Sequence, residues 1–117
     1  MAFTNLDYLR TITEGDTESI RELIILFIEQ VPEFIENLKK FLAEGRFAEL
    51  GNEAHKAKSS VMIMGMDELG HDMKSLQLDT IAKTGEDTYA ERVNRFEFQC
   101  LAAVVELNKE LEKMYQA

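Results

Sequence analysis

Hydrophobic residues recur at steps of three and four along most of the chain, which is the spacing of amphipathic helices. The longest series predicts a helix that begins after an N-cap at Asp16 or Thr17 and ends at Gly45. Pro32 lies inside this series, and the apolar positions keep their phase across it, so we expect a kink there rather than a break. The apolar positions of this helix are Ile20, Leu23, Ile24, Phe27, Ile28, Val31, Phe34, Ile35, Leu38 and Leu42.

The same spacing predicts four more helices, over residues 6–12, 47–64, 67 to about 82 and 87 to about 115. No run of alternating apolar and polar residues is long enough to indicate a sheet. Short connections between long amphipathic helices make consecutive helices antiparallel neighbours. We therefore predict an all-α fold, an up-and-down antiparallel four-helix bundle with a short additional N-terminal helix, in a single domain over residues 1–117.

The helix predicted over residues 47–64 has a narrow apolar face. At about 100° per residue, five side chains fall within roughly 40° of one direction, which we take as the core. These are Leu50, Ala54, Ala57, Val61 and Met64. His55 then points roughly 140° away from the core and Ser59 roughly 180°. Met62 and Met66 point roughly 120° and 160° away, so all four of these side chains are expected on the surface.

Composition and charge limit the possible partners of this surface. The chain has no apolar run of bilayer length and no N-terminal pattern of a secretory signal, and its only cysteine, Cys100, excludes an internal disulfide. We therefore expect a cytoplasmic protein with Cys100 packed in the core. The formal net charge of −9 disfavours binding to nucleic acid or to an anionic membrane. The expected partner is another protein.

An exposed histidine on a helix can carry out nucleophilic chemistry. A largely neutral imidazole has a free lone pair on one ring nitrogen and can accept a phosphoryl group. Lys58 lies three residues after His55, close enough to offset the negative charge of that group without competing for the attacking nitrogen. The small residues beside His55 would let another protein approach closely, and exposed Met62 and Met66 would supply adaptable apolar contacts.

These residues also form a motif that resembles the histidine-containing phosphotransfer (HPt) domains of multistep two-component phosphorelays. The family motif is histidine, two variable residues, lysine, a small residue, serine, and a glycine ten residues after the histidine. Here it is met by His55, Lys58, Ser59, Ser60 and Gly65, with Leu69 at a position where the family usually has leucine. The resemblance covers the whole chain, including Gly15-Asp16 before a long helix, a proline within that helix and the turn at Gly45. Position 59 is commonly glycine in the family, and the serine here adds a side chain where a receiver approaches.

The resemblance implies a helical bundle in which His55 takes a phosphoryl group from the aspartate of one receiver domain and passes it to another. It implies that the partners are response-regulator receiver domains, which include those of hybrid histidine kinases, and that Mg²⁺ comes with the receiver. Lys58 would stabilise the phosphate charge, while Ser59, Ser60, Met62 and Met66 would belong to the docking surface. No glycine-rich phosphate loop is present, so we expect a phosphoryl carrier without autokinase activity and without a bound cofactor. The acidic surface and the resemblance favour a monomer.

Two other functions are compatible with parts of the pattern. The first is a helical interaction module whose histidine is never phosphorylated and whose binding depends on Met62 or Met66. The second is a metal-binding bundle, because Glu68 and His71 have the Glu-x-x-His spacing of di-iron bundles. Such a site needs a second copy of the motif, which the chain lacks, so we expect His71 to be a surface residue and no metal to be bound.

Overall fold

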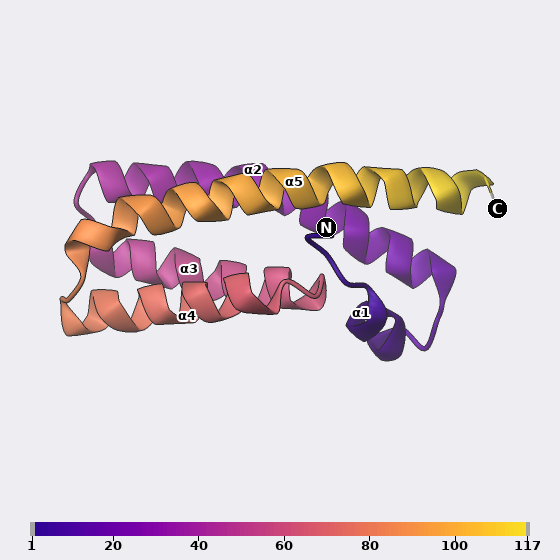
Figure 1. The fold of residues 1–117 in the computed structure, drawn as a ribbon, viewed down its shortest axis with the longest axis horizontal. Helices are drawn as coiled ribbons and strands as arrows, with labels where there is room; N and C mark the ends of the chain where they lie inside the picture. Colours follow the sequence, from indigo (N-terminus) through magenta and orange to yellow (C-terminus); the bar gives the residue numbers. More distant parts are fainter. Residues whose placement is uncertain (1, 117) are drawn as a thin grey trace.

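The computed structural model describes residues 2–116, which form five α-helices and one 3-10 turn and contain no strand. The elements are α1 (Asp7–Ile12), α2 (Thr17–Ala43), α3 (Phe47–Ile63), α4 (Asp67–Ala82), η1 (Glu86–Thr88) and α5 (Tyr89–Gln116). Helices α2 to α5 run alternately up and down in an elongated bundle of 48 × 23 × 21 Å (Figure 1). The predicted all-α bundle with a short N-terminal helix is confirmed.

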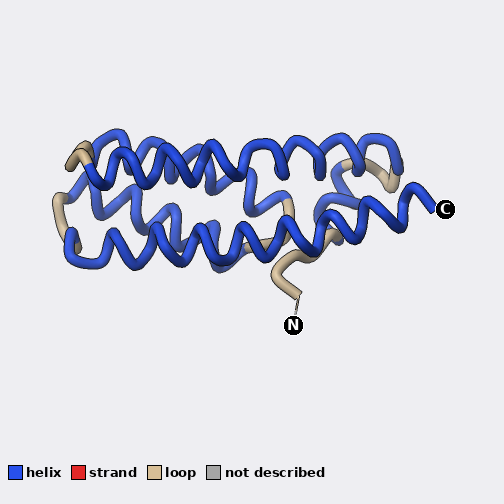
Figure 2. The backbone as a smooth tube through the Cα atoms, turned by 90° about the horizontal axis from the view of Figure 1, so that it is seen from above, coloured by secondary structure: helices blue, strands red, loops and turns tan. Residues whose placement is uncertain are grey.

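The two halves of the bundle differ because its helices differ in length. Helices α2 and α5 have 27 and 28 residues, whereas α3 and α4 have 17 and 16. The long pair therefore extends past the short pair, and α1 lies beside this extension (Figure 1). The loops lie at the ends of the helices (Figure 2). Four helices thus surround the core at one end, and α1, α2 and α5 form the other end.

The predicted helix ends agree with the observed ones within two residues, and their local chemistry explains them. Asp16 is the N-cap of α2, and its carboxylate accepts a hydrogen bond from the backbone N–H of Ser19 at 3.0 Å. Helix α2 continues through Pro32 without a break, while the kink expected there stays a prediction. The one added element is η1, which precedes α5, so α5 begins at Tyr89 rather than at residue 87.

Helices α3 and α4 pack against each other through two glycines, one on each helix. A Cβ atom on Gly51 would overlap the Thr80 hydroxyl and lie 3.2 Å from the Cβ of Thr80. On α4, a Cβ on Gly70 would overlap Met62 and lie 2.9 Å from its sulfur. Both glycines are buried inside helices, where glycine costs about 1 kcal/mol relative to alanine. Their presence makes the close α3–α4 contact possible.

The core follows the predicted apolar stripes. All five residues predicted to form the core face of α3, Leu50, Ala54, Ala57, Val61 and Met64, are at most 1% exposed. Aromatic pairs join the other helices, with the Phe34 and Phe96 rings 6.4 Å apart and the Phe47 and Tyr89 rings 5.2 Å apart, both edge to face. Cys100 is fully buried as predicted, and this burial raises the pKa of its thiol to about 12.

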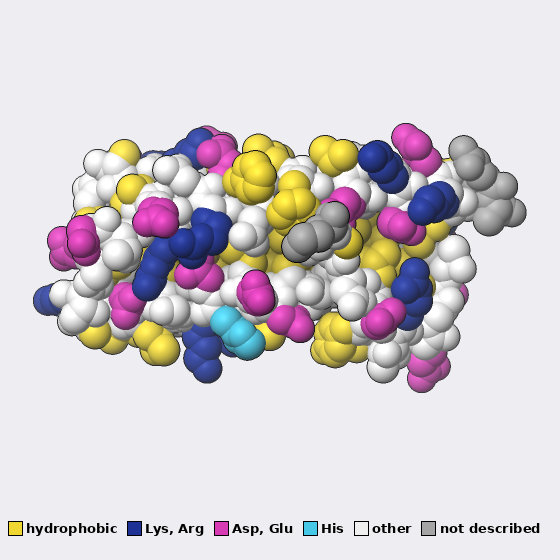
Figure 3. All heavy atoms as spheres, viewed as in Figure 1, with side chains coloured by type: hydrophobic (Ala, Val, Ile, Leu, Met, Phe, Trp, Pro, Cys, Tyr) yellow, Lys and Arg dark blue, Asp and Glu magenta, His cyan; other side chains and the backbone are white. Residues whose placement is uncertain are grey.

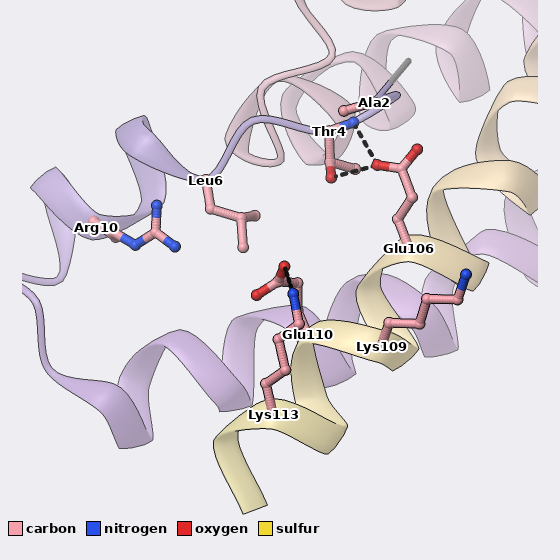
Figure 4. Close-up of a pocket in the computed structure, with 8 residues that line it drawn as sticks. All are labelled: Ala2, Thr4, Leu6, Arg10, Glu106, Lys109, Glu110 and Lys113. Atoms are coloured by element: carbon pink, nitrogen blue, oxygen red, sulfur yellow. Dashed lines mark hydrogen bonds and ion pairs between the residues drawn. The ribbon is translucent and has the colours of Figure 1, made fainter. Parts of the chain in front are cut away.

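The segment before α1 makes hydrogen bonds to α5 and to the turn between α3 and α4. The Glu106 carboxylate of α5 accepts hydrogen bonds from the backbone N–H groups of Phe3 and Thr4 and from the Thr4 hydroxyl, as Figure 4 shows for Thr4. One residue on, the N–H of Asn5 donates to the carbonyl of Met64 at 3.0 Å, in the turn between α3 and α4. Gly65 in this turn has a φ of +76°, which favours glycine. The segment therefore links α5 to the end of α3.

Candidate functional site

His55 lies on the solvent side of α3, as the helical geometry predicts. Ala54, directly before it, and Ala57, two residues after it, are fully buried, so the backbone of this part of α3 is firmly held in the bundle. The imidazole itself is exposed. A rigid helix therefore presents one ring to solvent, which is the arrangement that a reaction with a group on another protein requires.

The orientation of the imidazole is set by a side chain of α4. The Nδ1 atom of His55 lies 3.1 Å from the amide oxygen Oε1 of Gln77. Because this oxygen can only accept, the contact is a hydrogen bond when Nδ1 carries the proton. In that tautomer the lone pair is on Nε2, on the opposite side of the ring. Gln77 thus leaves Nε2 as the nucleophilic nitrogen.

Lys58 lies one turn along α3 from His55 and is half-buried. It lines a surface groove of about 570 Å³ together with Ser59, Met62, Ile63, Asp67 of α4 and Tyr8 of α1. Among the described residues, the ammonium group of Lys58 makes no ion pair with a carboxylate. The cation expected to accompany a phosphorylated histidine is therefore free to pair with an incoming anion.

The two serines of the motif differ in their surroundings. Ser59 is exposed and lies in the groove with Lys58. Ser60 is half-buried, and its hydroxyl donates to Oε1 of Gln30 on α2 at 3.1 Å. Ser60 therefore joins α3 to α2, whereas Ser59 is accessible to a partner.

The prediction that both Met62 and Met66 are exposed is wrong. Met62 is half-buried against Gly70, although it still lines the groove beside Lys58. Met66 is only 5% exposed. Helix α3 ends at Ile63, and the positive φ of Gly65 turns the chain, so a helical projection from α3 does not extend to residue 66. Met66 instead immediately precedes α4 and packs in the core.

Gln77 and Tyr8 were not predicted from the sequence as site residues. A signal for Gln77 exists in the chain, because residues equally far from a turn lie opposite each other in two antiparallel helices. His55 and Gln77 are each eleven residues from Met66, at the turn between α3 and α4. Tyr8 gives no such signal, since its place in the groove depends on how α1 packs.

The other surface features lie outside the His55 site. A hollow of about 460 Å³ between α1 and α5 is lined by Arg10, Lys109, Glu110 and Lys113 among others (Figure 4), and its lining includes no residue of the His55 site. His71 is exposed, as predicted. Within residues 2–116 no three histidine, cysteine or acidic side chains come together as a metal site would require.

Comparisons with known proteins place the chain in a family. The family model described as the Hpt domain matches residues 22–117. No curated protein and no solved structure matched the chain. Among the described residues, no helix is both long and apolar enough to cross a bilayer.

The chain belongs to the Hpt domain family, because the match covers most of its length. This membership implies histidine phosphotransfer in phosphorelays and interaction with response-regulator receiver domains. The family predicted from the motif around His55 is thus confirmed.

Proposed function

We propose that His55 is the phosphoacceptor, which takes a phosphoryl group from the aspartate of one receiver domain and passes it to another. The observation that carries the proposal is the exposed imidazole whose Nδ1 faces Gln77, which leaves the lone pair on Nε2. The motif spacing and the family match support the same residue.

The reaction is an exchange of one bond to phosphorus for another. The Nε2 lone pair attacks the phosphorus of the receiver's aspartyl phosphate, an N–P bond forms, and the P–O bond to the aspartate breaks and leaves a carboxylate. The Nδ1 proton stays on the ring and is held by Oε1 of Gln77 during the attack. In the second half of the relay, the carboxylate of the next receiver attacks the same phosphorus and Nε2 leaves.

Lys58 supplies electrostatic stabilisation rather than a bond. The transferred group spreads negative charge over three oxygens, and a cation one helical turn away lowers the free energy of that charge in both the transition state and the phosphohistidine. The position of Lys58 at the edge of the groove, with no ion pair among the residues that the structure describes, supports this role.

Several further parts of the proposal concern the partner and the setting. We propose that Mg²⁺ comes with the receiver and that Ser59, Met62 and the groove beside Tyr8 form part of the docking surface. Met66 is buried, so it can pack beneath this surface but cannot contact a receiver directly. The acidic net charge supports a monomer, and the single cysteine supports a cytoplasmic location.

The proposal is tested by incubating the purified chain with a panel of phosphorylated receiver domains. The expected result is acid-labile, base-stable phosphate on the wild type and none on His55→Gln, with circular dichroism showing that both are equally helical. A matched control is His71→Gln, which changes the other exposed histidine and should keep full labelling. Equal label on His55→Gln, or no label from any receiver of a broad panel, would refute the proposal and favour a helical interaction module.

A further inference from the structure

Helix α4 carries two large apolar side chains on its surface close to the site. Leu78 is 52% exposed and Ile81 is 69% exposed. Lys74, Gln77 and Ile81 follow one another at steps of three and four, so they form one row along α4, with Leu78 beside it. Figure 3 shows hydrophobic and basic side chains along the lower edge of the molecule, over α4. Gln77, in the middle of this row, is the residue that contacts His55.

The position of His55 on α3 brings it to this row. Gly51, His55 and Met62 lie on one edge of α3, and each contacts α4, at Thr80, Gln77 and Gly70 respectively. These three contacts fix the antiparallel register, in which the residue numbers of each pair sum to about 132. Lys58 is then opposite Lys74, and Ile81 lies one turn past Gln77. The imidazole therefore stands at the α4 edge of α3, next to the exposed row.

The charges around His55 differ in sign from those of the whole chain. The chain has a net charge of −9, yet the charged side chains beside His55 on the α4 edge of α3 are Lys58 and, across from it, Lys74. The carboxylates in the same stretches are paired within the bundle. Glu53 is buried, accepts a hydrogen bond from Asn37 on α2 and pairs with Lys56 at 3.8 Å, and Asp79 pairs with Arg92 of α5 at 2.9 Å.

From these relationships we infer that Lys74, Leu78 and Ile81 form a receiver-docking surface on α4, continuous with the His55 site. The inference rests on the proposed function. The occupant is a receiver domain, because an aspartyl phosphate with its metal-binding carboxylates is acidic and complements Lys58 and Lys74, which make no ion pair among the described residues. Two copies of the chain, each with a net charge of −9, repel each other, which disfavours a second copy as the occupant.

With this surface, two neighbouring surfaces adjoin His55. The groove with Tyr8, Ser59 and Met62 follows His55 toward the C-terminal end of α3, and the row with Lys74, Leu78 and Ile81 lies beside His55 on α4. A receiver that covers His55 is close to both, since the imidazole contacts Gln77 in the row and lies one turn from Lys58 in the groove. The identity of residues 74, 78 and 81 therefore determines how well a given receiver docks.

The test compares phosphoryl transfer to the Leu78→Asp/Ile81→Asp variant with transfer to a matched control. The control is Phe98→Asp/Leu101→Asp, which changes two apolar residues of similar exposure, 68% and 49%, on α5. The donor is the receiver that phosphorylates the wild type fastest in the panel. We expect kcat/KM for the α4 variant to fall about tenfold or more, with the rate at saturating receiver little changed, and the control to equal the wild type. Lys74→Glu should also lower kcat/KM at low salt, and by less at high salt.

The results of this experiment distinguish a failure of the docking surface on α4 from a failure of the proposed function, on which the inference rests. If the wild type is labelled and the α4 variant transfers as fast as the α5 control, the docking surface on α4 is refuted while the function stands. The same conclusion follows if the α4 variant loses only its saturated rate. If no receiver labels the wild type, both the proposed function and the inference fail.

Discussion

The imidazole of His55 on α3 and the side-chain amide of Gln77 on α4 meet with Nδ1 and Oε1 3.1 Å apart. The two residues are far apart in the sequence and become neighbours because the turn at Gly65 folds α4 back along α3. Glycines at positions 51 and 70 let the two helices approach closely enough for this contact. The packing of the bundle therefore determines which nitrogen of His55 can act as nucleophile.

Replacing Gln77 tests this relationship. Gln77→Ala removes the acceptor for the Nδ1 proton, and a hydrogen bond of this kind is worth about 1 kcal/mol, so we expect phosphoryl transfer to slow about fivefold. Nitrogen-15 NMR of the imidazole should show a lower population of the tautomer with the proton on Nδ1. Gln30→Ala is the matched control, because it removes a glutamine bonded to Ser60 rather than to His55. Unchanged transfer and tautomer populations in Gln77→Ala would contradict the account.

The close α3–α4 contact predicts coupling between Gly51 and Thr80. Gly51→Ala should destabilise the fold by about 1–2 kcal/mol, because the new Cβ would overlap the Thr80 hydroxyl and outweigh the gain in helix propensity. In a Thr80→Ala background the hydroxyl is absent, so the same change should cost much less. Urea unfolding of the two single variants and the double variant measures this difference. Additive effects would show that the two residues do not meet.

The cap of α2 predicts a pH-dependent stability. Hydrogen bonds from the Ser19 side chain and backbone N–H lower the pKa of Asp16 from its ordinary value of 3.8. Because the folded pKa is depressed, the stabilisation is present above the ordinary value and is lost as the pH falls through the lower, folded value. Asp16→Ala should therefore lower Tm at neutral pH, with a difference from the wild type that shrinks in strong acid. Asp16→Asn, which caps without titrating, should keep most of the stability at neutral pH. A constant difference at all pH values would contradict this explanation.

The thiol of Cys100 should be unreactive in the folded protein. Burial raises its pKa to about 12, so hardly any thiolate exists at neutral pH, and the fully buried side chain is closed to reagents. Folded protein should react with a disulfide reagent only as fast as it unfolds, whereas protein in urea should react completely and at once. Rapid reaction of the folded protein would mean that α5 does not pack here as described.

The helices and the exposure of His55 could be predicted from the sequence, whereas the positions of some residues around His55 could not. Local periodicity places Leu50, Ala54 and Ala57 inward and His55 outward, because every one of them belongs to a single regular helix. Met66 was misplaced because the projection was carried past the end of that helix. Gln77 and Tyr8 reach the site through the packing of α4 and α1, which depends on side chains from several helices at once.

The most direct test of the account is to locate the phosphorus atom on the phosphorylated chain. A nitrogen-15 and phosphorus-31 correlation spectrum of the uniformly labelled protein, phosphorylated by a receiver, should show one N–P coupling, to Nε2 of His55. A coupling to Nδ1 of His55 would contradict the role of Gln77, and phosphorus on any other residue would contradict the assignment of His55 as the phosphoacceptor.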